Sequence, residues 1–220
     1  MQGRLTKPKA ILFDWDNTLV DSWPTIHQAL KVTFEEMGHT PWTLEETKVK
    51  VHRSMRDAFP DIFGDKWQKA GELYQENYRN IHLDSLAPMA DVEVMLDKLH
   101  AMNDIYVAVV SNKSSGNLHK EVDYINWKRF FRSVVGATDA AEDKPAAAPV
   151  LLALSGSGIK PNEDVWFVGD SVTDMECAHN TGCLPVFFGE RDKDDGAFVH
   201  CPPKVTFKNH QEFIDALEQF

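Results

Sequence analysis

Two aspartates one residue apart, Asp14 and Asp16, follow a run of four apolar residues at 10–13. Such a run predicts a buried strand, so both carboxyl groups would lie where that strand ends. Two carboxylates at this spacing repel each other and require a cation or a shared proton. Together with Thr18 on the same short turn, they suit a hard metal ion with oxygen ligands. The alternative is an acidic turn that only caps the strand, because so short a motif also matches by chance.

Three further polar clusters follow later predicted strands: two lie at strand ends, and the one at Asp143 lies between a short strand and a helix. Strands are predicted over residues 105–110, 133–136 and 165–168. The clusters after them are Ser111-Asn112-Lys113, Asp143-Lys144-Pro145, and Gly169-Asp170-Ser171 with Asp174 one helical turn later. Parallel strands present their carboxyl ends at one edge of a sheet, which is where open α/β folds bind ligands. We therefore expect all four clusters to converge.

The elements that would position these clusters are of two kinds. From residue 86 onward, predicted strands alternate with helices, which indicates βαβ units and a parallel sheet. Residues 40–85 give only helical patterns. Predicted strands lie at 9–14, 105–110, 133–136, 165–168 and 185–188, and predicted helices at 24–37, 43–50, 54–63, 66–81, 91–102, 115–125, 146–155, 174–181 and 210–220, with a surface loop at 190–203. We predict an α/β fold: a doubly wound, Rossmann-like parallel sheet from 1–19 and 86–220, with a helical domain at 20–85 inserted after the first strand.

Composition narrows the classes of partner. A net charge of −11 over 220 residues disfavours nucleic acid, which needs a basic surface, and anionic membranes. An anionic substrate stays compatible, because a metal and a lysine in the site would set the local field. Cys177, Cys183 and Cys201 lack metal-site spacing and indicate free thiols in a reducing compartment. With no signal-peptide pattern and no spanning apolar stretch, we expect a cytoplasmic protein. The sequence leaves its oligomeric state open between a monomer and a homodimer.

Taken together, the four clusters resemble the four motifs of the haloacid dehalogenase superfamily, in order and over nearly the whole chain. The matching residues are Asp14, Asp16 and Thr18 in the first motif, Ser111 in the second, Lys144 in the third, and Gly169, Asp170, Ser171 and Asp174 in the fourth. The helical segment after the first motif is similar to the cap of the subfamily that includes phosphoglycolate phosphatases and β-phosphoglucomutases.

The resemblance implies a Mg²⁺-dependent phosphatase, a phosphoric monoester hydrolase for a small metabolite similar to phosphoglycolate or a sugar phosphate. Asp14 would attack phosphorus to form an aspartyl-phosphate, and Asp16 would protonate the leaving oxygen and then activate water. A carboxylate and a phosphate repel each other by roughly 4 kcal/mol per unit-charge pair at about 4 Å and an effective dielectric of about 20. A cation must offset that repulsion.

The resemblance also implies roles for the other motif residues. Mg²⁺ would be held by Asp14, the backbone carbonyl of Asp16, and Asp170. Lys144 would contact both the nucleophile and the phosphate. The phosphoryl oxygens would be held by Thr18, Ser111, Asn112 and Lys144, and the supporting positions behind the metal and the lysine are Ser171 and Asp174.

Within the cap, three residues between two predicted helices are candidates for substrate recognition: His52, Arg53 and Arg56. They could bind an anionic group of the substrate, and the alternative is a solvated basic turn. Two departures from the family pattern lie in the first motif. Asn17 stands where glycine is frequent, and asparagine tolerates a left-handed backbone. Trp15 replaces the usual aliphatic residue.

Other reactions stay open at this point. A phosphosugar mutase of the β-phosphoglucomutase type shares these motifs, and its cap must exclude water. A phosphonatase would need a cap lysine, for which Lys48 and Lys50 are candidates. A dehalogenase is disfavoured by Asp16, which supplies the acid and base of a phosphatase. A non-catalytic binding protein of this family is disfavoured because every catalytic position is filled.

Overall fold

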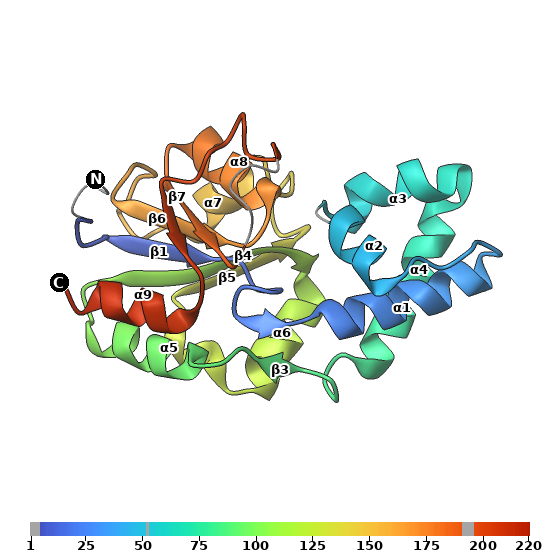
Figure 1. The fold of residues 1–220 in the computed structure, drawn as a ribbon, viewed down its shortest axis with the longest axis horizontal. Helices are drawn as coiled ribbons and strands as arrows, with labels where there is room; N and C mark the ends of the chain where they lie inside the picture. The colour runs from blue at the N-terminus through green and yellow to red at the C-terminus, as the bar shows by residue number, and fades with distance from the viewer. Residues whose placement is uncertain (1–4, 52, 191–195) are drawn as a thin grey trace.

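The structure is a computed structural model that describes residues 5–51, 53–190 and 196–220. Within these residues, six parallel strands form one sheet in the order β5-β4-β1-β6-β7-β8 (Figure 1). The strands are β1 (Ala10–Phe13), β4 (Tyr106–Ser114), β5 (Ser133–Ala137), β6 (Val165–Gly169), β7 (Leu184–Phe188) and β8 (Val205–Phe207). The predicted α/β fold with a parallel sheet is confirmed.

Helices cover both faces of this sheet. One layer contains α5 (Val92–Ala101), α6 (Ser115–Tyr124) and α9 (His210–Leu217), and the other contains α7 (Ala148–Ala153) and α8 (Val172–Thr181). Successive side chains of a strand point to opposite faces. In β1, Ile11 and Phe13 therefore pack in the first layer, while Ala10 and Leu12 pack in the second. Because it is buried on both faces, β1 is an unbroken apolar run.

The register of β1 brings the polar clusters to one level. Phe13 pairs with Val109 of β4 on one side and with Val168 of β6 on the other. The residues that follow these three positions are therefore neighbours at the carboxyl edge of the sheet. We predicted that strand β4 ends at residue 110, with Ser111-Asn112-Lys113 after it. Strand β4 instead continues to Ser114, so these three residues lie within the strand. The pairing of β4 with β5 shifts register between Val110 and Ser114.

Residues 20–85, which we call the helical insert, lie to one side of the sheet (Figure 1). The insert contains α1 (Trp23–Glu36), α2 (Leu44–Lys50), α3 (Met55–Phe63), the 3₁₀ turn Gly64–Lys66 and α4 (Trp67–Ile81). It has an apolar core of its own, centred on Leu30, Phe34, Phe59 and Phe63. The domain boundaries at 19/20 and 85/86 stay a prediction.

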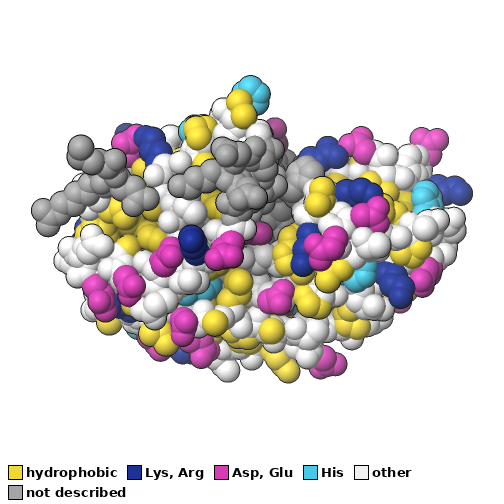
Figure 2. Space-filling view, in the orientation of Figure 1, with side chains coloured by type: hydrophobic (Ala, Val, Ile, Leu, Met, Phe, Trp, Pro, Cys, Tyr) yellow, Lys and Arg dark blue, Asp and Glu magenta, His cyan; other side chains and the backbone are white. Residues whose placement is uncertain are grey.

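Some short elements were not predicted. Strands β2 (Val20–Asp21) and β3 (Ala87–Pro88) pair antiparallel where the chain enters and leaves the insert. Strand β8 adds an edge to the sheet, and a 3₁₀ turn covers Trp127–Phe130. On the face seen in Figure 2, acidic and basic side chains are mixed over the sheet part and the insert. In the described part of the chain, no helix combines the length and apolar character needed to cross a membrane.

Candidate active site

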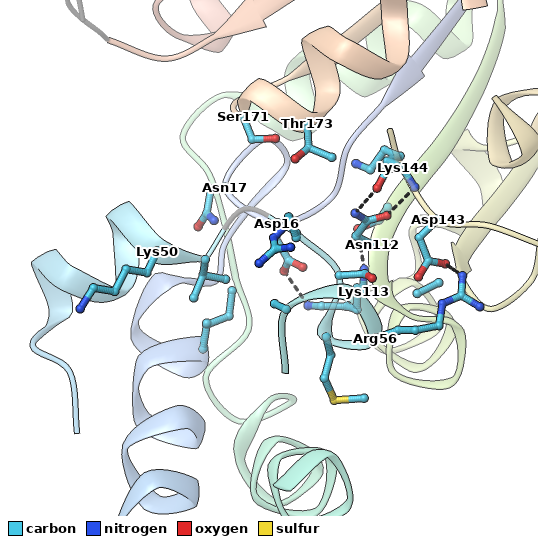
Figure 3. A pocket seen from close by; sticks show the side chains of 18 of the residues that line it. Asp16, Asn17, Lys50, Arg56, Asn112, Lys113, Asp143, Lys144, Ser171 and Thr173 are labelled. Atoms are coloured by element: carbon cyan, nitrogen blue, oxygen red, sulfur yellow. Dashed lines mark hydrogen bonds and ion pairs between the residues drawn. The ribbon is translucent and has the colours of Figure 1, made fainter. Parts of the chain in front are cut away.

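The four polar clusters converge, as expected, around one cavity of about 690 Å³ between the carboxyl edge of the sheet and the helical insert (Figure 3). Members of every cluster line it: Asp14, Asp16, Ser111, Asn112, Lys113, Asp143, Lys144, Asp170 and Ser171. The insert contributes a largely apolar wall formed by Ile26, Leu30, Trp42, Phe59 and Ile62. The cavity therefore has a charged floor at the sheet and, at the insert, a roof that combines this apolar wall with basic side chains.

Lys144 lies at the centre of the charged floor. Its side chain is buried, and Nζ lies 2.8 Å from Asp14 Oδ1 and 2.7 Å from Asp174 Oδ1. Burial opposes the lysine charge, but the carboxylates of Asp14 and Asp174 raise the pKa of Lys144 well above its ordinary value. The side chain of Asn112 clamps the lysine backbone: the Lys144 N–H donates to Asn112 Oδ1 at 2.9 Å, and Asn112 Nδ2 donates to the Lys144 carbonyl at 3.0 Å. Lys144 is thus a charged group held at a fixed position.

Three carboxylates cluster at the cavity floor, and two of them, Asp14 and Asp174, contact Lys144. Oxygens of Asp14, Asp170 and Asp174 lie within 4.8 Å of one another. Burial raises the pKa of Asp14 to about 6, with further increases from Asp174 and Asp16 and an opposing effect from Lys144. Burial, with the neighbouring Asp174 and Asp14, also raises the pKa of Asp170 well above its ordinary range. One lysine leaves excess negative charge, and oxygen donors at this spacing fit a hard divalent cation.

Asp174 is already engaged by protein donors. Oδ1 faces Lys144, while Oδ2 accepts the Ser171 N–H at 3.0 Å and the Ser171 hydroxyl at 2.6 Å. Ser171 and Asp174 thereby form the capping box that begins α8. A Cβ at Gly169 would lie 2.3 Å from Asp174 Cγ, so only glycine lets this aspartate fold back against β6. Asp14 and Asp170 are the carboxylates left to face the cavity.

The raised pKa of Asp14 predicts a pH dependence of stability in the metal-free protein. Because folding raises this pKa from 3.8 to about 6, the folded state binds more protons than the unfolded state between these values. Stability from this group is therefore present at low pH and lost as pH rises, by about 3 kcal/mol at about 1.4 kcal/mol per pKa unit.

Urea unfolding between about pH 4 and pH 7 measures this effect. We expect the stability of Asp14→Asn relative to the native chain to increase as pH rises through this interval. Parallel pH profiles for the two proteins would contradict the assignment. Added Mg²⁺ should reduce the difference, because a cation stabilises the ionised carboxylate.

The other predicted phosphate-binding residues differ in their placement. Ser111 is buried at the cavity, and its hydroxyl accepts the Lys113 N–H at 3.2 Å. Both ends of the Asn112 amide hold the backbone of Lys144, so its contact with phosphate stays a prediction. Thr18 is fully buried and lies outside the cavity lining, so its position does not support the predicted contact with phosphate. Thr18 belongs to the first sequence motif because it lies on the turn that follows β1, and this position does not by itself bring its side chain to the cavity.

Two of the predicted recognition residues of the insert, Arg53 and Arg56, are paired with acids. Arg53 contacts Asp61 at 2.7 Å on the surface. Arg56 reaches across the cavity to the buried carboxylate of Asp143 at 2.9 Å, next to Lys144 (Figure 3). Both arginines line the cavity, and their contact with substrate stays a prediction. His52 lies outside the described residues.

One buried cation at the site received no role from the sequence. Lys113 is 8% exposed, and its Nζ lies 2.6 Å from Asp16 Oδ1 (Figure 3). Its place in the Ser111-Asn112-Lys113 cluster was visible in the sequence. A lysine in a polar cluster is ordinarily solvated, so only the packing of the insert over β4 makes it part of the site.

A charged cleft at the carboxyl edge of a doubly wound sheet, roofed by a helical insert after the first strand, defines a two-part α/β enzyme. A family model of haloacid dehalogenase-like hydrolases matches residues 11–187, and the chain belongs to this family. The predicted family and the prediction of a hydrolytic enzyme are confirmed.

Individual relatives agree with this assignment. The chain is 29% identical over 190 residues to a phosphoglycolate phosphatase of Chromobacterium violaceum, covering 82% of this chain and 85% of the relative. It is 30% identical over 178 residues to a phosphoglycolate phosphatase of Aquifex aeolicus, covering 79% and 81%. In fold, it is similar to a haloacid dehalogenase-like hydrolase of Streptococcus pneumoniae, with a TM-score of 0.84, 20% identity, and coverage of 97% and 100%.

Proposed function

We propose that the chain hydrolyses a small phosphate monoester, of the phosphoglycolate or sugar-phosphate kind, through a phosphoryl group carried on Asp14. That it is a phosphatase of this family follows from its relatives. The observation that supports the residue assignment is the contact between Lys144 and Asp14 at the cavity floor. A buried carboxylate beside a fixed ammonium can approach a phosphate that an isolated carboxylate would repel.

The reaction proceeds in two steps, transfer of the phosphoryl group to Asp14 and hydrolysis of the resulting aspartyl-phosphate. A carboxylate oxygen of Asp14 forms a bond to phosphorus while the bond from phosphorus to the ester oxygen breaks, and Asp16 gives its proton to the leaving oxygen. Water then attacks phosphorus, Asp16 takes the proton of that water, and the bond to Asp14 breaks to release inorganic phosphate. Lys144 and the Ser111 hydroxyl stabilise the negative charge on the phosphoryl oxygens in both steps.

A Mg²⁺ ion is the cofactor we propose for this site. Asp14, Asp170 and the backbone carbonyl of Asp16 would hold it, and the excess of acidic oxygens at the cavity floor supports this choice. When bound, the ion supplies positive charge against the phosphoryl oxygens. It would also lower the raised pKa of Asp14, so that the nucleophile would stay ionised over a wider range of pH.

Release of inorganic phosphate from phosphoglycolate and a panel of sugar phosphates tests the proposal. We expect turnover of at least one ester with Mg²⁺ and its loss in EDTA. The absence of turnover on every ester would overturn the phosphatase mechanism, and full activity in EDTA would overturn the metal. Conversion of one sugar phosphate into its isomer without phosphate release would identify the mutase reaction in its place.

A further inference from the structure

A buried polar network extends from Asp16 away from the cavity. Lys113 Nζ lies 2.6 Å from each of three oxygens, which belong to Asp16, Tyr78 and Glu121. Glu121 is fully buried on α6, and Tyr78 lies on α4 of the insert. The Asp16 side chain meets this network at the ammonium group of Lys113.

Glu121 gathers donors from three different segments. Its Oε2 accepts the indole N–H of Trp15 at 2.6 Å and also faces Lys113. Its Oε1 accepts the Tyr78 hydroxyl at 3.1 Å and contacts His82 Nδ1 at 2.7 Å. Trp15 stands between the two motif aspartates, whereas Tyr78 and His82 belong to the end of the insert. One carboxylate therefore joins the nucleophile turn, β4, α6 and the insert.

The buried charges of Lys113 and Glu121 are each stabilised by neighbouring groups of the network. Burial opposes the charge of Lys113, but Asp16 and Glu121 raise its pKa above the ordinary value. Burial likewise opposes the charge of Glu121, but hydrogen bonds from His82, Lys113 and Trp15 lower its pKa. Desolvating two ions costs about as much as their attraction returns, so stability alone does not account for this arrangement. Its geometric effect is to fix one oxygen of Asp16.

We propose that Lys113 and Glu121 are positioning residues that orient Asp16 for proton transfer, and that Tyr78 and His82 make this orientation depend on the docking of the insert. The inference rests on the proposed function of Asp16 as acid and base. With Oδ1 held by Lys113, Oδ2 is the oxygen that exchanges the proton. Proton transfer requires the donor oxygen to be aimed at the leaving group, and an unheld aspartate loses that aim.

Sensitivity to the leaving group separates this role from a merely structural one. An alkyl phosphate expels a basic alkoxide that needs a proton from Asp16, whereas 2,4-dinitrophenyl phosphate expels a stable phenolate that does not. The parameter kcat/KM reports only the steps up to loss of the leaving group. Hydrolysis of the phosphorylated Asp14, in which Asp16 acts as the base, therefore does not enter this comparison.

The test compares kcat/KM of Lys113→Met and Glu121→Gln on these two esters with Mg²⁺ present. We expect a loss of about 10²-fold on the alkyl ester and less than about tenfold on the dinitrophenyl ester. Tyr78→Phe, on the insert, should show the same selectivity with a smaller loss. Equal losses on both esters, or no loss on either, would overturn the inference.

Controls keep the outcome interpretable. Lys120 and Asp123 lie exposed on α6, so the variants Lys120→Met and Asp123→Asn should leave kcat/KM on both esters unchanged. If Lys113→Met does not fold, the double variant Lys113→Met/Glu121→Gln removes both buried charges together and must show the same selectivity. Asp16→Asn separates the two hypotheses. If Asp16→Asn loses more kcat/KM on the alkyl ester than on the dinitrophenyl ester, but the Lys113 and Glu121 variants do not, only the positioning role is overturned. If Asp16→Asn itself shows no such difference, the proposed role of Asp16 as acid is overturned as well.

Discussion

The Asp14→Asn substitution is expected to lower kcat/KM for every phosphate ester by roughly 10⁴-fold or more, because an amide cannot carry the phosphoryl group. The fold should survive the change. Asparagine has nearly the shape of aspartate and removes one of three clustered acids, and Lys144 keeps its contact with Asp174. Steady-state phosphate release and thermal unfolding of the same preparations measure the two effects.

Asp97→Asn is a matched control, since this aspartate lies exposed on α5, away from the cavity lining. It should retain native kinetics. Metal-dependent turnover that survives in Asp14→Asn at near-native rate would place the nucleophile elsewhere in the cavity. It would also remove the reason for treating Asp14 and Asp16 as residues with different functions.

Lys144→Met is expected to impair stability and activity together. Removing one partner of a buried ion pair costs about 3–5 kcal/mol of unfolding free energy, because the carboxylates of Asp14 and Asp174 lose their shared cation. Loss of a positive charge aimed at the phosphoryl group should lower kcat by about 10²–10³-fold. Urea unfolding and phosphate release measure these effects.

Mg²⁺ gives the Lys144 prediction a second, independent measurement. A divalent cation among the same carboxylates should restore part of the lost stability, so Lys144→Met should gain more from Mg²⁺ than the native chain does. Lys160→Met, at an exposed position, is the control. An unfolding midpoint equal to that of the native chain, with or without Mg²⁺, would show that the lysine does not hold the acidic cluster together.

The parallel sheet was predictable because its central strands are buried on both faces. A strand such as β6, with Trp166 and Phe167 on opposite faces, has to be apolar throughout and stands out from its polar neighbours. The short strands β2, β3 and β8 carry no such pattern. They form because neighbouring backbone is already in place, so pairing and not side-chain periodicity determines them.

The cavity floor was predictable for a related reason. Asp14 and Asp170 stand next to strand ends, where sequence and topology together fix their location. Lys144 lies in the segment that joins β5 to α7. Glu121 was missed because helical acids are ordinarily solvated. A signal was nevertheless present: in α6, Glu121 shares one face with Leu118 and Val122, and an acid on an apolar face requires buried partners.

The pairing of β2 with β3 means that the chain departs from and returns to the sheet part at almost one point. A segment whose two ends lie side by side can be exchanged as one unit by recombination, without interrupting the sheet that carries the nucleophile. The contacts of Tyr78 and His82 with Glu121 limit that freedom. Under the positioning role proposed for Glu121, a transplanted segment has to bring donors at these two positions, so the roof of the cavity can be replaced more freely than the end of α4.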